Sequence, residues 1–158
     1  MLKRIKEIKQ GKYCLIVKYE FETVNSETDE AVWVPNQLQG DVWISLELMD
    51  ELIQLFVNRI GLEIDAQICT WRSLTWSYNK FGAEVSLKLE VDGDRTPKPV
   101  PITIGGIAIG GSDGECHFTT QRESELLQKI ADEALTATRE IFAQHNRQLE
   151  LLNQPEAA

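Results

Sequence analysis

The chain has 158 residues, of which 42% are hydrophobic and 26% charged, as expected for one globular domain with a packed core. Its formal net charge of −9 disfavours general nucleic-acid binding, because phosphate contacts require a cationic face. The apolar runs are too short to cross a membrane. Cys14, Cys69 and Cys116 show no CxxC spacing and no even pairing, so we expect a cytoplasmic protein without a disulfide framework.

The first 40 residues combine a basic start with two strand patterns. Apolar residues recur every three positions over residues 1–10 among lysines and an arginine, which predicts a basic arm or short helix. Strict alternation predicts a strand over residues 13–24, and residues 31–35 are predicted to form a second strand antiparallel to it. Pro35 should end that strand or place it at a sheet edge, because proline has no N–H to donate.

The middle of the chain reads as a helix followed by strands. Ser45 is a capping residue before an apolar face that runs to Ile60, and Gly61 is a suitable stop. The segment Asp41–Ser45 fits either a strand or the start of this helix. Further strands are predicted over residues 62–68, 74–78, 84–91 and 99–109.

The last quarter, residues 119–153, predicts one long amphipathic helix. Thr120 and Glu123 have the spacing of a capping box, and apolar residues then recur at three- and four-residue steps. Such a helix would span roughly 50 Å, whereas a compact chain of this size is roughly 40 Å across. The helix must therefore either break near Gln144 or overhang the domain.

The order of these elements predicts a single α+β domain over residues 1–158. We expect an antiparallel sheet of about five to six strands, with one internal helix and the C-terminal helix packed on one face. The basic segment 1–10 and the helix 119–153 flank this sheet in the sequence.

The sequence shows no catalytic constellation. Cys116 and His117 are adjacent, so on a strand they point to opposite faces and cannot pair. The two histidines and three cysteines lack the spacing of a metal site. The glycine pairs in residues 103–112 are not followed by the lysine of a phosphate-binding loop, and they favour a bulge or a close packing contact. We predict no catalytic residue, no metal and no cofactor.

Our main functional hypothesis is a non-enzymatic protein-interaction module: an adaptor, a chaperone-like subunit or an inhibitor that acts as a homo-oligomer. An overhanging helix ending in Leu149, Leu151 and Leu152 would need a covering partner. We predict that Leu149 and Leu152 bind it, with Trp33 and Trp43 as anchors, because tryptophan is enriched at binding hot spots. We expect a dimer that also binds another protein, with a basic partner favoured by the acidic chain, and that binds neither nucleic acid nor a membrane.

The alternative is a small-molecule-binding module built on the glycine-rich strand 103–112 and nearby tryptophans. Its ligand-binding residues would be Gly105, Gly106, Gly110, Gly111, Trp71 and Trp76. An enzyme of unrecognised type and an acidic mimic of nucleic acid are less favoured readings of the same chain.

Overall fold

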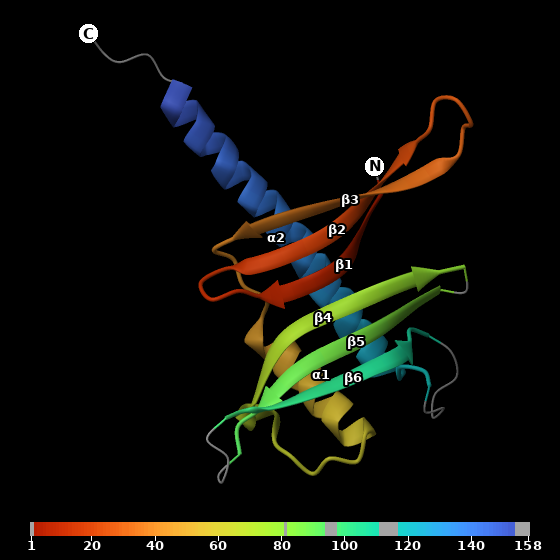
Figure 1. Ribbon diagram of the computed structural model, residues 1–158, viewed down its shortest axis with the longest axis vertical. Helices are drawn as coiled ribbons and strands as arrows, with labels where there is room; N and C mark the ends of the chain where they lie inside the picture. The colour runs from red at the N-terminus through yellow and green to blue at the C-terminus, as the bar shows by residue number, and fades with distance from the viewer. Residues whose placement is uncertain (1, 81, 94–97, 111–116, 154–158) are drawn as a thin grey trace.

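A computed structural model describes residues 2–80, 82–93, 98–110 and 117–153. In this part of the chain a six-stranded antiparallel sheet lies against two α-helices (Figure 1). The predicted α+β class, with an internal helix and a long C-terminal helix, is confirmed.

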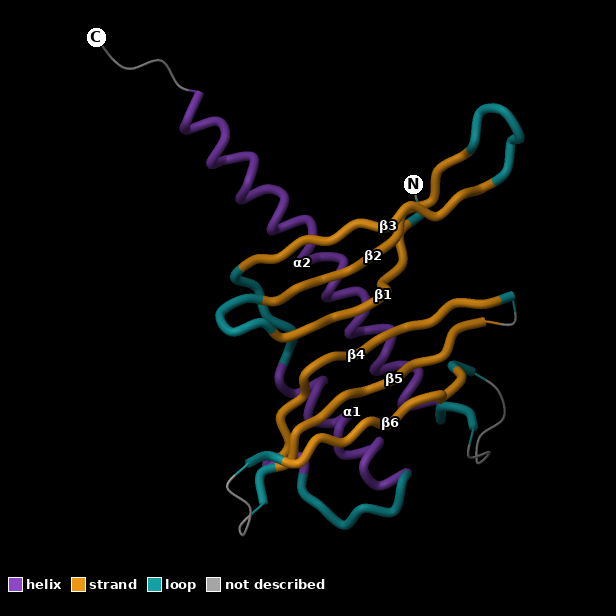
Figure 2. The backbone as a smooth tube through the Cα atoms, in the orientation of Figure 1, coloured by secondary structure: helices purple, strands orange, loops and turns teal. Residues whose placement is uncertain are grey.

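The elements follow one another as three strands and a helix, twice. They are β1 (Lys3–Gln10), β2 (Leu15–Val24), β3 (Ala31–Gly40), α1 (Leu46–Arg59), η1 (Ala66–Ile68), β4 (Cys69–Asn79), β5 (Gly82–Val91), β6 (Val100–Ala108) and α2 (Gln121–Asn153). The strand order is β3-β2-β1-β4-β5-β6, so each half contributes three adjacent strands. Within the described sheet the two halves are joined by the pairing of β1 with β4, and Figure 2 shows these two strands diverging.

The prediction of an arm or helix over residues 1–10 is wrong, because this segment is strand β1 at the centre of the sheet. A bulge between Ile5 and Glu7 adds one residue to β1 relative to β2. Ile5 and Ile8, three positions apart, therefore both enter the core and are 1% and 0% exposed. The bulge produces a three-residue apolar spacing that resembles a helical one.

The strands predicted over residues 13–24 and 31–35 are present as the antiparallel pair β2 and β3. Strand β3 is an edge strand, as Pro35 suggested, but it continues through Pro35 to Gly40. An edge strand accommodates Pro35 in its middle, because alternate N–H groups of an edge face solvent and need no partner strand.

The cap and stop of α1 are confirmed. The Ser45 Oγ accepts a hydrogen bond from the Leu48 N–H at 3.5 Å, and Gly61 takes a φ of 75° just after the helix. The segment before Ser45, residues 41–44, is neither strand nor helix.

The prediction of a strand over residues 62–68 is wrong, because β4 begins only at Cys69. Residues 62–65 are irregular, and the short 3₁₀ helix η1 follows them. The side chain of Gln54 donates to the Ile64 carbonyl at 3.2 Å and accepts from the Ala66 N–H at 2.9 Å. This amide satisfies backbone groups that a neighbouring strand would otherwise have to pair.

Helix α2 begins with the predicted capping box. The Glu123 N–H donates to Thr120 Oγ1 at 3.2 Å, and the Thr120 N–H donates to Glu123 Oε1 at 2.8 Å. The helix is continuous past Gln144 to Asn153 and overhangs the sheet, as Figure 1 shows. Among the side chains of α2 that the structure describes, the last buried one is Ile141, which packs against Gly40.

Candidate functional site

The end of α2 beyond Ile141, residues 142–153, is here called the projecting end. Four large apolar side chains on it are exposed: Phe142 (59%), Leu149 (56%), Leu151 (68%) and Leu152 (80%). Leu149 and Leu152 are the residues that the sequence predicted for partner binding. Leu151, which the sequence placed in the same overhanging stripe, is exposed with them. Phe142 was not predicted; it follows Ile141, the residue that packs against the sheet at Gly40.

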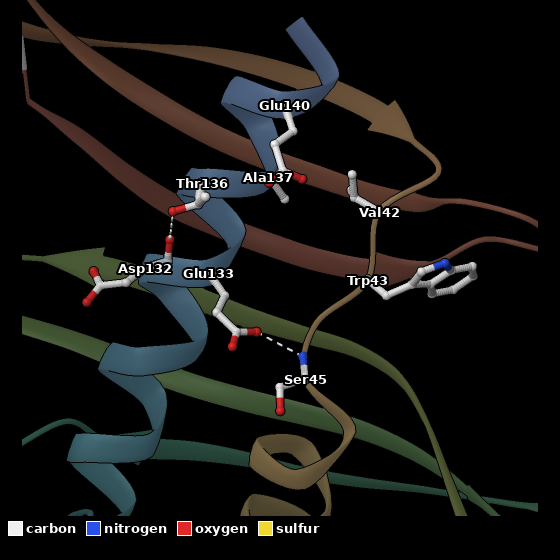
Figure 3. Close-up of a pocket in the computed structure, with 8 residues that line it drawn as sticks. All are labelled: Val42, Trp43, Ser45, Asp132, Glu133, Thr136, Ala137 and Glu140. Carbon is white, nitrogen blue, oxygen red and sulfur yellow. Dashed lines mark hydrogen bonds between the residues drawn. The ribbon is translucent and has the colours of Figure 1, made fainter. Parts of the chain in front are cut away.

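A groove lies beside α2 where the linker from β3 to α1 passes it, and we call it the Trp43 groove (Figure 3). It has a volume of about 480 Å³. Its walls are Val42, Trp43 and Ser45 of the linker and Asp132, Glu133, Thr136, Ala137 and Glu140 of α2. Trp43 is 58% exposed, and Figure 3 shows its indole extending away from α2. The structure thus presents this predicted anchor on the surface.

The Trp43 groove is acidic. Glu133 accepts a hydrogen bond from the Ser45 N–H at 2.8 Å, which ties the linker to α2 (Figure 3). Asp132 accepts from the side-chain amide of Gln128 at 3.0 Å, and Glu140 is exposed. Within the described parts of the chain, none of these carboxylates forms an ion pair with a cation of this chain. Their negative charge is therefore available to a partner.

Trp33 is placed differently from Trp43, because it is half-buried and contacts its own chain. The Arg4 guanidinium carbon lies 4.0 Å from the centroid of the Trp33 ring and 4.2 Å from that of the Tyr78 ring. Arg4 also donates to Glu20 at 3.2 Å. Trp33 therefore stacks within a cluster that spans both halves of the sheet.

The glycines predicted for ligand binding form a bulge in β6. The register of β5 and β6 shifts between Val85 and Leu87, and Gly106 there takes a φ of 70°. A Cβ on Gly105 would lie 2.9 Å from Ser86 Oγ. Gly110 donates its N–H to Thr119 Oγ1 at 3.1 Å. Gly111 lies outside the described residues.

The predicted tryptophan partners of these glycines face the other way. Trp71 and Trp76 are 6% and 4% exposed in the core under the helices. Trp76 pairs with Val85, so the next residue, Ser86, and with it Gly105 point to the opposite face of the sheet. The sheet thus separates Gly105 from these tryptophans.

Other site chemistry is limited in the described part of the chain. No group of three or more His, Cys, Asp or Glu side chains there could hold a metal ion, and Cys14 and Cys69 are free thiols. Neither described α-helix is long and apolar enough to cross a membrane. No family model, curated protein or solved structure matches the chain.

Proposed function

We propose that this protein is a non-enzymatic, cytoplasmic interaction module that forms a homodimer and binds another protein, as an adaptor, a chaperone-like subunit or an inhibitor. The observation that carries this proposal is the projecting end of α2. It extends on the order of 18 Å beyond Ile141 and exposes four large apolar side chains. Large apolar side chains exposed together at the end of a projecting helix favour an interaction site.

A second copy of α2 suits the projecting end as its occupant. Phe142, Leu149 and Leu152 are seven and three positions apart, which is the spacing of core positions in a coiled coil. Pairing two such ends would cover the stripe on both chains at once. Because the seam is short, we expect a weak dimer whose population depends on concentration.

Truncation after Gln144 tests the homodimer. It keeps the contact of Ile141 with Gly40 and removes Leu149 and Leu152, so the truncated chain should be a folded monomer while the full chain dimerises. Native mass spectrometry and light scattering measure the difference. The double variant Leu149→Ser/Leu152→Ser should also be monomeric.

The matched control for that double variant is Gln144→Ser/Arg147→Ser, which places the same two serines on the same helix end and should leave the dimer intact. A full-length chain that remains monomeric at about 1 mM, where even a dimer with a Kd of about 100 μM would be mostly paired, would refute self-association. So would a truncated chain that still dimerises.

The Trp43 groove is the surface we propose for the partner protein, through a basic segment. An exposed indole beside the carboxylates of Asp132, Glu133 and Glu140 offers stacking and ion pairing to a lysine or arginine side chain. Charge complementarity of this kind selects partners and speeds their encounter.

The groove is tested by native mass spectrometry of protein purified gently from its source. A protein that co-purifies with the unaltered chain should be absent from Glu140→Lys and Trp43→Ala. The amount that co-purifies with the unaltered chain should decrease with added salt, since screening weakens ion pairs at a surface. The control Asp50→Lys makes the same change of charge at an exposed position outside the groove and should keep the partner. Retention by Glu140→Lys would exclude the groove.

A further inference from the structure

A separate cavity lies beneath α2 where β1 and β4 part. The pairing of these strands covers only three residue pairs and ends at Glu7 and Thr75. Figures 1 and 2 show the strands diverging beyond that point, with α2 crossing behind the opening. The cavity there has a volume of about 320 Å³, at the lower end of the range for small-molecule sites.

The floor of this cavity is apolar and held in place by the core. Ile5, Trp76 and Leu127 line it and are 1%, 4% and 1% exposed, and Ala131 of α2 adds a small side chain above them. Small residues of this kind leave space that a larger side chain would fill. The floor is therefore preformed for an apolar group.

Tyr78 bridges the two strands after their pairing ends. Its hydroxyl donates a hydrogen bond to the Ile5 carbonyl at 2.5 Å, which links β4 to β1 across the opening. Burial raises the pKa of Tyr78 to about 12, so this phenol is neutral at physiological pH. The bridge keeps the wall of the cavity in one position without adding negative charge.

The rim of the cavity is cationic in a chain whose net charge is −9. Among the described residues that line it, Lys3 and Arg4 are the charged ones, and no carboxylate is present. Arg4 is already hydrogen-bonded to Glu20. Lys3 Nζ lies 5.6 Å from the centroid of the Tyr19 ring and makes no ion pair with a described carboxylate, so its charge is available to a ligand.

We propose that this cavity binds a small organic monoanion with an apolar body, such as a medium-chain carboxylate. The carboxylate would pair with Lys3. Ser124 and Gln128 also line the cavity, but their side chains already hydrogen-bond Thr119 and Asp132, so Lys3 is the group that would hold the anion. The apolar body would lie against Trp76 and Leu127. This site is independent of the projecting end and of the Trp43 groove.

Octanoate, with octan-1-ol as the uncharged probe of equal length, tests the proposal on the full chain. In an NMR titration octanoate should saturate with shifts of the Trp76 indole, and it should bind about tenfold tighter than octan-1-ol, the effect of one charge-assisted contact. Lys3→Ala should remove this preference and leave the binding of octan-1-ol unchanged. Lys12→Ala, an exposed lysine outside the cavity, is the control for net charge.

Ala131→Phe should fill the cavity and abolish binding of both probes, whereas Ala143→Phe on the projecting end should not. The proposal is overturned if octanoate shows no saturation by about 10 mM, because a Kd above that concentration corresponds to less than about 3 kcal/mol of binding free energy. It is also overturned if octan-1-ol binds as tightly as octanoate, or if folded Ala131→Phe still binds. The chain truncated after Gln144 should retain binding, so failure of this site and failure of dimerisation are separate results.

Discussion

Replacing Glu123 by alanine is expected to lower the free energy of unfolding by about 3–5 kcal/mol, the usual cost of removing one partner of a buried ion pair. The Glu123 side chain is 2% exposed and accepts a hydrogen bond from Arg59 Nε at 3.1 Å. The variant removes this carboxylate from a guanidinium that is itself only 14% exposed. It also removes the hydrogen bond that the Thr120 N–H donates to Glu123 in the capping box. Urea unfolding followed by circular dichroism measures the loss.

The same carboxylate makes stability depend on pH. Burial alone would raise the pKa of Glu123, but the hydrogen bonds from Arg59 and Thr120 outweigh it and hold the pKa below its usual value. A depressed pKa in the folded state means that the contribution is full above the unfolded pKa of about 4.3 and is lost as pH falls through the folded pKa. Glu123→Gln should therefore flatten the loss of stability in acid.

The control for Glu123 is the neighbouring pair Arg122–Glu51, which also joins α2 to α1. Arg122 Nε lies 2.6 Å from Glu51 Oε2, but both side chains are over 40% exposed. Water and salt screen such a pair, so Arg122→Gln should change stability little. Equal losses from Glu123→Ala and Arg122→Gln would contradict the assignment of the buried pair as the stabilising contact.

Local sequence patterns predicted those helices and strands in which buried apolar residues recur at a regular spacing. The alternation in β5 placed Val85, Leu87 and Leu89 in the core, and the capping box fixed the start of α2. The pattern failed where a long-range feature replaced the period. The bulge between Ile5 and Glu7 gives β1 a three-residue apolar spacing, which led to the prediction of a helix. Over residues 62–68 the Gln54 side chain, and not a neighbouring strand, accepts the hydrogen bond of the Ala66 N–H.

The candidate sites were harder to predict because exposure depends on which face of the sheet the helices cover. Trp43 and Trp76 are equally apolar in the sequence, yet one is exposed in a linker and the other is buried under α2. The cavity beside Trp76 exists because β1 and β4 pair over only a short stretch. Because β1 and β4 are far apart in the chain, the sequence pattern of neither strand shows how far their pairing extends.

Replacing Ile141 by alanine is expected to cost about 2–5 kcal/mol, because this side chain is 0% exposed and is the last buried contact of α2 before the projecting end. Its neighbour is Gly40 at the end of β3. A Cβ on Gly40 would lie 2.6 Å from Ile141 Cγ1, which is closer than two non-bonded carbon atoms approach in proteins. Gly40→Ala should therefore overpack this contact at a cost of about 1–3 kcal/mol.

The two changes should compensate each other, because Ile141→Ala vacates the space that the added methyl group needs. The double variant Gly40→Ala/Ile141→Ala should lose less stability than the sum of the single variants, with a coupling of about 1–3 kcal/mol by urea unfolding. Gly61→Ala is the control, since Gly61 has a φ of 75° and no atom near its added Cβ. Its cost of about 1 kcal/mol reflects backbone strain alone and should add to that of Ile141→Ala. Additive losses at Gly40 and Ile141 would mean that α2 is not held on the sheet by this contact, and would remove the anchor from which the projecting end extends.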